Sequence, residues 1–424
     1  MAFAWLSTLK RHRHALTQNP LIKGGHKVAR WCVIMTLKAV RANAWARNAL
    51  HLPRNKVVEP LGCGSGMRVI RIGEAQTFFR PALNLPEDGA VKRFFSDRQH
   101  VAMEPSYVAV IDGGRVWGYA YGCVFTRDGS FIPAFSRDPW GAKMHGVWLR
   151  SKLPEPVRVP GRVLYLVTPE AGCNYHHWLL DLLPRIGAVE RAGFALGDFD
   201  RIVINHANLA FQWETLERLG VPRSRVFTIN QSVCWQADQL VVPSLLASNE
   251  FIAAESVQFL RDRLPSKQAV VGASRRLFLS RRDASARRLV NESEIERLVH
   301  RYGFETIVLS GLSVARQAQI FSEAEMIMGS GAGLANLVFA PTHARVIELA
   351  SPRWLTVYHW MLSARLGVDH TLVLANGDAR AEAASIRHRE KDFSIDPQKL
   401  QRVLDALERS YVSGSASSYG CEKL

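Results

Sequence analysis

One short segment of the chain combines a histidine, an aspartate and an arginine at intervals of four residues. The segment is N-Y-H-H-W-L-L-D-L-L-P-R at 174–185, so His177, Asp181 and Arg185 fall on one face of a helix. A histidine with a carboxylate one turn away can serve as a general base whose tautomer is held. A buried, hydrogen-bonded histidine beside an Asp181–Arg185 ion pair is the equally good structural interpretation.

A second segment is rich in arginine. Six of the fourteen residues from 275 to 288 are arginines, and they begin around the apolar stretch Leu277-Phe-Leu279. Guanidinium groups match phosphate oxygens in bidentate fashion, so a loop of this kind at the end of a strand suits a nucleotide diphosphate. The alternative is a solvated basic loop. Asn291, with Glu294 three residues later, fits a helix N-cap and receives no ligand role.

A third segment, I-M-G-S-G-A-G-L-A-N at 327–336, predicts a strand, a glycine-rich turn and a helix start. Glycines let a phosphate approach the backbone, and the first turn of a helix offers free N–H donors. The next predicted strand ends at Glu348, whose carboxylate can accept from ribose hydroxyls or be an ordinary strand-end residue.

Two other motifs resemble ligand sites less convincingly. The glycines at 62, 64 and 66 look like the loop of methyltransferases that use S-adenosylmethionine, but Pro60 interrupts the strand before them and 68–72 reads as another strand. Asp198 and Asp200 form a D-x-D that can hold a divalent metal, yet they precede the predicted strand 201–205. We interpret them as a solvated turn, because ligands lie at the carboxyl ends of strands.

The elements that position these residues follow a simple order. Residues 65–155 read as β-rich, with strand–turn–strand patterns around Asp112-Gly-Gly114 and Asp128-Gly129. From about 160, strands and helices alternate in two blocks, which predicts an α/β fold with two parallel sheets and a cleft between the blocks. The predicted regions are a basic, partly helical segment (1–58), a β-rich region (59–155), α/β lobes (156–265 and 266–380) and a helix with a loose tail (381–424).

Charge is concentrated at the start of the chain. The net charge is +16 over 424 residues, and residues 1–58 contain eleven Lys or Arg and no acidic residue, which leaves +5 for the rest. The pattern argues against a nucleic-acid binder and allows a helix on an anionic membrane surface, a docked amphipathic helix or a basic tail. Six widely spaced cysteines predict free thiols, and we find neither a signal peptide nor a membrane span.

Together the three segments resemble glycosyltransferase family 61, over roughly residues 160–375. The resemblance lies in N-x-x-H-W-L-L-D-x-L-P-R at 174–185, S-R-R-D-A-x-x-R-R-x-x-N-E at 280–292 and G-A-G-L-A-N at 331–336. The family commonly has histidine before G-A-G, where this chain has Ser330. A serine there weakens a contact to the donor phosphates or indicates a different donor.

The resemblance implies two Rossmann-like lobes of the GT-B type and an inverting glycosyltransferase of capsular or surface polysaccharide biosynthesis. It implies His177 as base, with Asp181 as its orienter or as the base itself, and an acceptor side with Asn174, His176 and Arg185. The implied donor-side residues are Arg281, Arg287, Arg288, Ser330, Gly331, Ala332, Gly333, Asn336 and Glu348. Arginines and helix N–H groups can stabilise a departing nucleotide diphosphate without a metal, so we expect no cofactor.

The expected partners are a nucleotide-sugar donor and a glycan or lipid-linked acceptor, with the enzyme in the cytoplasm, either free or on the inner membrane face. The main alternative is a non-catalytic protein of the same fold that binds sugar nucleotides or polysaccharide, which Ser330 makes worth testing. A methyltransferase is the second alternative.

Overall fold

The computed structural model describes residues 32, 35–36, 54–57, 66–83, 89–118, 122–136, 145, 147, 153–247, 251–265, 274–376 and 391–418, with only the backbone of 54–57 and 410–418. The chain divides into two compact units. Unit 1 comprises Met1–Phe78 and Ala102–Leu264, and unit 2 comprises Phe79–Val101 and Pro265–Leu424. Each unit has its own sheet, and the mixed α/β class with parallel strands is confirmed.

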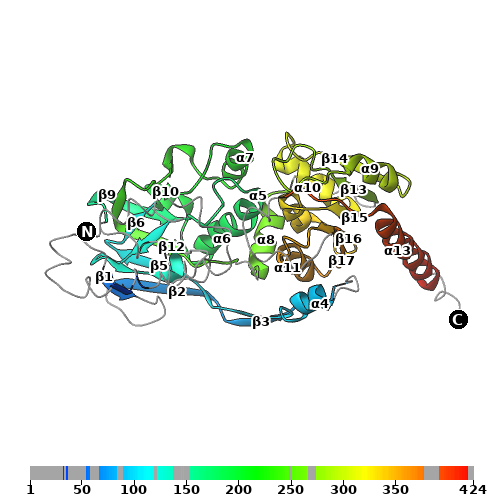
Figure 1. Ribbon diagram of the computed structural model, residues 1–424. Coiled ribbons are helices and arrows are strands. Elements are labelled where there is room, and N and C mark those ends of the chain that lie inside the picture. Colours follow the sequence, from blue (N-terminus) through cyan, green and yellow to red (C-terminus); the bar gives the residue numbers. More distant parts are fainter. Residues whose placement is uncertain are drawn as a thin grey trace, which may run out of the picture. The chain divides into compact units, whose positions relative to one another are not determined.

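Unit 1 is built on a ten-stranded mixed sheet (Figure 1). Its central strand β12 (Cys234–Pro243) runs parallel to β9 (Pro156–Tyr165) and antiparallel to β5 (Ser106–Asp112) and β6 (Arg115–Trp117). Strands from the predicted β-rich region and the predicted first lobe therefore share one sheet. The remaining strands are β1 (Arg54–Val57), β2 (Met67–Gly73), β7 (Cys123–Phe125), β8 (Ser130–Phe131), β10 (Arg201–Val203) and β11 (Val226–Phe227).

The two predicted strand–turn–strand signals have different outcomes. The signal at Asp128-Gly129 is a hairpin, since β7 and β8 pair antiparallel. The signal at Asp112-Gly-Gly114 is not a hairpin: β5 and β6 both pair antiparallel with β12 in the same register, and Gly113 and Gly114 lie between them. Gly113 has a φ of +66° and Gly129 a φ of +83°. Both structures need the same left-handed glycine, so local sequence does not separate them.

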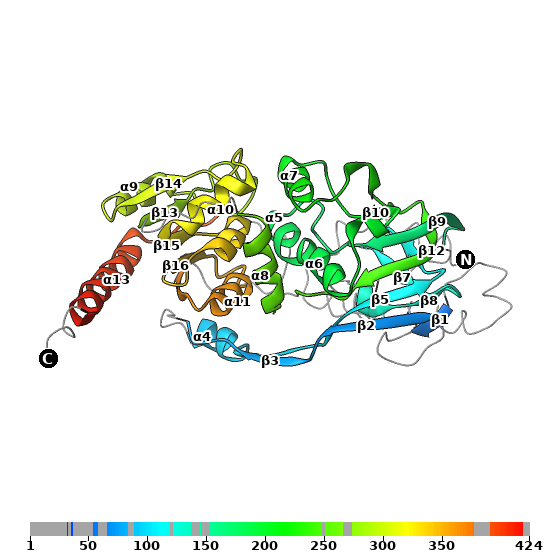
Figure 2. The ribbon, with the colours of Figure 1, turned by 180° about the vertical axis from the view of Figure 1, so that it is seen from behind.

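Helices cover the parallel part of the unit 1 sheet. They are α5 (Tyr175–His177), the π-helical turn η4 (Trp178–Leu182), α6 (Pro184–Arg191), α7 (Ala210–Arg218) and α8 (Ala254–Arg263). Helix α6 contacts β12, β5 and α8. Its Gly187 lies so close to Phe259 of α8 that a Cβ atom there would be 2.5 Å from the ring. Figure 2 shows α6 between α8 and the strands.

Unit 2 contains a five-stranded, fully parallel sheet. Its order is β14 (Phe304–Ile307), β13 (Arg275–Leu279), β15 (Ala324–Gly329), β16 (Arg345–Ala350) and β17 (Asp369–Leu374). Counted along the chain this order is 2-1-3-4-5, so the connection direction reverses between β13 and β15. In open parallel sheets, ligands bind at the carboxyl ends of the strands that flank such a reversal.

Helices pack on both faces of this sheet (Figure 1). One core cluster joins the strands to α9 (Glu292–His300) and α13 (Pro397–Ser418), through side chains such as Ile295 and Leu400. A second cluster joins β16 and β17 to α11 (Tyr358–Leu366) and to α4 (Gly89–Ser96), which explains why residues 79–101 group with unit 2. The remaining elements are α10 (Val314–Ser322), the 3₁₀ helix η7 (Ala332–Phe339) and the paired strands β3 (Gln76–Phe79) and β4 (His100–Met103).

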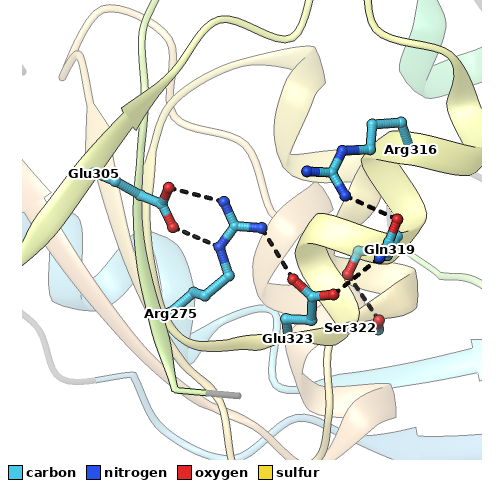
Figure 3. A network of polar contacts seen from close by, with 6 residues as sticks. All are labelled: Arg275, Glu305, Arg316, Gln319, Ser322 and Glu323. Atoms are coloured by element: carbon cyan, nitrogen blue, oxygen red, sulfur yellow. Dashed lines mark hydrogen bonds and ion pairs between the residues drawn. The ribbon is translucent and has the colours of Figure 1, made fainter. Parts of the chain in front are cut away.

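Two of the six clustered arginines belong to the sheet and not to a loop. Arg275, at the start of β13, binds both carboxylate oxygens of Glu305 and also contacts Glu323 at 3.0 Å (Figure 3). Arg276 is ion-paired with Glu325 and Glu408. These contacts lie at the amino end of the strand, which is the wrong end for a ligand of this sheet. Our assignment of these two arginines to a phosphate-binding loop was therefore wrong.

Several further predictions can be placed. Asp198 accepts from the backbone N–H of Ala195 and Asp200 from that of Arg162, so the D-x-D is a structural turn. Strand β2 follows Gly66 where a methyltransferase loop would open a helix. Helix α13 extends to Ser418, so the tail predicted to be loose is helical that far. The basic segment lies outside the described residues apart from Cys32, Met35, Thr36 and β1.

Candidate active site

His177 lies between two carboxylates in unit 1. Its Nδ1 is 2.8 Å from Oδ2 of Asp181, and its Nε2 is 3.0 Å from Oε2 of Glu170. The side chains of His177 and Asp181 are 10% and 9% exposed, whereas that of Glu170 is 51% exposed. Burial alone would lower the pKa of His177, but the hydrogen bonds and charges of Asp181 and Glu170 outweigh burial and raise it to about 9.

The local backbone explains how His177 and Asp181 meet. Asn174 is the N-cap of α5, because its side-chain oxygen accepts from the backbone N–H of His176 at 3.0 Å. The helix then widens into η4 before Pro184 starts α6. Such π-helical turns occur frequently at functional sites. Asn174 thus sets where the helix starts, and the ring of His176 packs 5.3 Å from that of His177.

Arg185 has a different place from the one we expected. It is fully buried, and its guanidinium donates to the carbonyls of Tyr165 and Val167 at the end of β9 and of Pro243 at the end of β12. These bonds tie together the carboxyl ends of two neighbouring strands and direct the guanidinium to the backbone. His177 and Asp181 keep the predicted four-residue contact, but the π-helical turn η4 lies between His177 and Arg185 and changes the spacing that would place Arg185 on the same face.

Arg185 binds the ends of β9 and β12, which is where the strand order of the unit 1 sheet reverses. The parallel strands lie in the order β12-β9-β10-β11, so the chain leaves β9 towards β10 on one side and returns as β12 on the other. The turn carrying Glu170 and the helix carrying His177 follow the carboxyl end of β9 at this reversal. This is the position at which open parallel sheets bind ligands.

In unit 2 the glycine-rich turn packs directly on an arginine. Gly331 has a φ of +74°, and a Cβ atom at this residue would lie 2.2 Å from Nη1 of Arg281. Arg281 donates to the backbone carbonyls of Ala286, Arg287 and Ser330. Glycine suits this position because its φ is left-handed, and because a Cβ atom would require a shift of the guanidinium that ties the loop after β13 to the turn after β15.

The two neighbouring arginines of the loop have different environments. The guanidinium of Arg287 lies 5.3 Å from the ring centre of Trp354, a cation–π distance. Arg288 donates to Asp392 through its backbone N–H, Nε and Nη2, and it lines a cavity of about 420 Å³ together with Arg282, Glu292 and Glu296. Arg288 is therefore occupied by an acidic partner that sequence reasoning missed.

Glu348 is held by two histidines. Its Oε1 is 2.6 Å from Nδ1 of His359 and its Oε2 is 3.2 Å from Nε2 of His370, while Nδ1 of His370 lies 2.9 Å from the hydroxyl of Ser363. All four residues are buried. Burial would raise the pKa of Glu348, but the two histidines hold it well below its usual range. Glu348 pairs with Gly329 across β15 and β16, so the cluster borders the glycine-rich turn.

The remaining predicted donor residues separate into two groups. Ser330, Ala332 and Gly333 are half-buried at the start of η7, whose first N–H groups lack partners within the helix. Asn336 is fully buried, and its amide donates to Gln317 and to the carbonyl of Gly333. We therefore correct the assignment of Asn336 from a donor contact to a residue that fixes η7 against α10. Asn291 is the N-cap residue of α9, as predicted, but its side chain does not bond the helix backbone; its amide donates to Glu294 and to the carbonyl of Ile395.

Sequence reasoning did not find Glu170, Trp354, His359 or His370. Glu170 follows the apolar run of β9, and that strand-end position was the available signal. Among the described residues, no group of three or more His, Cys, Asp or Glu side chains is arranged to hold a metal ion. The same residues include no helix that combines the length and the apolar character needed to cross a bilayer.

Each unit has a sheet with parallel strands and polar side chains near a strand reversal, which is where open α/β sheets bind ligands. Residues 175–347 match the family described as Glycosyltransferase 61. The match confirms the resemblance inferred from the three motifs. It supports glycosyltransferase activity, with a sugar donor and a glycan acceptor as substrates. No curated protein matches the chain.

Proposed function

We propose that the protein is an inverting glycosyltransferase that moves a sugar from a nucleotide-sugar donor to a hydroxyl of a glycan or lipid-linked acceptor in bacterial capsular or surface polysaccharide biosynthesis. The observation that carries the proposal is the His177–Asp181 pair, with its 2.8 Å contact, inside the family segment. Asp181 orients the ring through Nδ1, and Nε2 takes the proton of the acceptor hydroxyl. The hydroxyl oxygen attacks the anomeric carbon while the bond to the diphosphate breaks, and the diphosphate leaves with the electron pair.

The donor site that we propose is the reversal between β13 and β15. Arg287 supplies a guanidinium for the diphosphate, and the backbone N–H groups of Gly331, Ala332 and Gly333 supply neutral donors. Arg281 adds positive charge behind the turn. Glu348 retains lone pairs for ribose hydroxyls because each carboxylate oxygen can accept more than one hydrogen bond. Departing charge is stabilised by these groups, so we propose that transfer does not require a metal.

Neighbouring arginines give a matched test of the donor site. A screen of nucleoside diphosphates and their sugars by thermal shift identifies a ligand, because binding raises apparent stability by mass action. In Arg287→Ala the affinity for that ligand should then fall by roughly tenfold or more, which is the loss expected when a charge-assisted hydrogen bond is removed. Arg288→Ala changes the affinity less than about twofold, because its guanidinium already binds Asp392. Equal losses in both variants would contradict this assignment.

Inversion and metal independence are tested on the product. Proton NMR of the newly formed glycoside reports the anomeric configuration, and we expect it to be opposite to that of the donor. Turnover in a chelator is expected to equal turnover in Mg²⁺. A retained configuration, or loss of turnover in the chelator, would refute the corresponding part of the proposal.

A non-catalytic binding protein is the second candidate, because both ring nitrogens of His177 are engaged by carboxylates. Slow hydrolysis of the donor without acceptor distinguishes the two, since leakage to water indicates a working site.

We also propose that the basic residues 1–58 bring the enzyme to an anionic membrane surface. Vesicle flotation of the full chain and of a chain lacking residues 1–50 tests this proposal. Unchanged flotation of the truncated chain would contradict membrane binding by the basic segment.

A further inference from the structure

His177 has no nitrogen available for a substrate in this structure. Asp181 lies on Nδ1 at 2.8 Å and Glu170 on Nε2 at 3.0 Å. A neutral imidazole has only one N–H, so donating to both carboxylates requires the imidazolium form. The raised pKa of His177, about 9, agrees with that form. An imidazolium has no lone pair with which to take a proton from a hydroxyl.

The two carboxylates are not equivalent. Asp181 is buried and follows His177 by one helical turn, so it cannot leave without disrupting η4. Glu170 comes from the turn after β9, and half of its side chain is exposed. Rotation of an exposed side chain takes picoseconds to nanoseconds. Glu170 is therefore the partner that an incoming molecule can displace.

Glu170 has a left-handed backbone conformation, and its side chain contacts the ring of His177. Its φ is +63°, an uncommon value for a residue with a side chain. Its carbonyl accepts from the N–H groups of Cys173 and Asn174 at 3.2 and 3.0 Å, which ties the turn to the start of α5. Backbone strain of this kind persists where the surroundings fix it, and it concentrates at functional sites. The turn stays in place while the side chain moves.

We propose that Glu170 is a proton gate for the transfer reaction, an inference that rests on the proposed function: its carboxylate covers Nε2 of His177 until an acceptor hydroxyl takes its place. Glu170 accepts the proton of Nε2, rotates into solvent and releases that proton to water. The lone pair left on Nε2 then accepts the proton of the acceptor hydroxyl as the new bond to the anomeric carbon forms. His177 ends as the imidazolium again, and Glu170 returns to it.

Of the two carboxylates that raise the pKa of His177, Glu170 is the one whose charge can be removed while the ring stays oriented. Asp181 and Glu170 are the charged groups that raise the pKa of His177, and the ring of His176 lies beside it. Helix α8 packs against η4, and none of its charged side chains contributes to the shift. Removing the charge of Glu170 therefore lowers the pKa of His177 while Asp181 still orients the ring.

The test combines a substrate-free measurement with a rate profile on the full chain. Histidine-labelled protein is titrated by NMR, with the His177 signal assigned by its absence in His177→Ala. In Glu170→Gln we expect the pKa of His177 to fall by about one unit or more, which makes roughly tenfold more neutral base at pH 7. The acid limb of kcat/KM, which reports the free enzyme, should move to lower pH by the same amount. Glu170→Asp should lie between Glu170→Gln and the wild type.

Glu190→Gln is the matched control, because Glu190 pairs with Arg263 on the surface of the same unit and should change neither measurement. An unchanged pKa of His177 in Glu170→Gln would overturn the gate. A folded Glu170→Gln that is inactive at every pH would also overturn it, since Glu170 would then be the base itself. Absence of transfer by the wild type from any donor refutes the proposed function and the gate with it, and the NMR shift shows separately whether the contact exists.

Discussion

Unit 1 and unit 2 each hold a histidine–carboxylate cluster, and the two clusters have opposite compositions. In unit 1 one histidine, His177, lies between two carboxylates, and in unit 2 one carboxylate, Glu348, lies between two histidines. The group in the minority is the one driven to its charged form: the pKa of His177 rises to about 9, and that of Glu348 falls well below its usual range. Composition therefore decides which group is fixed.

Exposure separates the two clusters further. Glu170 is half exposed, whereas His359 and His370 are 6% and 2% exposed in their side chains. A cluster with one exposed member can change its protonation when a substrate arrives, and a fully buried cluster cannot do so without unfolding its surroundings. The unit 1 cluster thus suits proton transfer, and the unit 2 cluster suits a permanent charge beside the glycine-rich turn.

The largest expected effect is on the rate of sugar transfer, which depends on the unit 1 cluster. His177→Ala should lower transfer by roughly 10²- to 10⁴-fold, the usual contribution of a general base. Steady-state transfer from the donor found in the screen measures it. His206→Ala, which removes a partly exposed histidine of the same unit, is the control and should keep most of the activity. A transfer rate of His177→Ala within twofold of the wild-type rate would show that the unit 1 cluster does not supply the general base.

The unit 2 cluster should act on stability. Glu348→Gln should lower the free energy of unfolding by about 3 kcal/mol, because it removes a buried carboxylate that contacts two buried histidines. The folded-state pKa of Glu348 lies below its unfolded value of about 4.5, so its contribution is present above pH 4.5 and is lost as the pH falls. Urea unfolding at pH 7 and pH 3.5 measures the difference.

Glu190→Gln removes a partly exposed ion pair and should cost no more than about 1 kcal/mol at either pH. A difference for Glu348→Gln that stays the same at pH 3.5 would show that the carboxylate is not held ionised.

The unit 1 cluster should show the opposite dependence on pH. The folded-state pKa of His177 lies above its unfolded value of 6.5, so its stabilisation is complete below pH 6.5 and disappears as the pH rises through about 9. Asp181→Asn should therefore cost about 2 kcal/mol at pH 6 and much less at pH 9.5, because the lost ion pair no longer exists there. Urea unfolding at both values measures it, and equal costs would contradict the charged state of His177.

The two clusters also differ in how many of their residues could be predicted from the sequence. The His177–Asp181 pair was predictable because it lies within one helical turn, where spacing alone fixes proximity. Glu170 reaches His177 from a turn whose left-handed residue is not a glycine, so apart from its position after β9 the local sequence does not mark it. His359 and His370 meet Glu348 from α11 and β17, and only tertiary packing brings them together.

The folds of the two units were predictable to different degrees for a related reason. Unit 2 alternates strand and helix with short connections, and each apolar run is a buried parallel strand, as the pattern predicts. Unit 1 adds antiparallel strands whose partner, β12, lies more than a hundred residues away. The turn at Gly113–Gly114 therefore resembles a hairpin in the local sequence, because the pairing of both flanking strands with β12 cannot be seen in the segment itself.

The smallest effect concerns the outer member of the unit 2 cluster. Ser363→Ala removes the hydroxyl that lies 2.9 Å from Nδ1 of His370 and leaves that nitrogen buried without it, which should cost about 1 kcal/mol of unfolding free energy. If Ser363 acts by orienting His370 towards Glu348, its loss should cost clearly less in a Glu348→Gln background, because there is no longer a carboxylate to orient towards. A double-mutant cycle in urea measures this coupling. Strictly additive losses would show that Ser363 and Glu348 stabilise unit 2 independently, and the three side chains would then not form one cluster comparable to the one around His177.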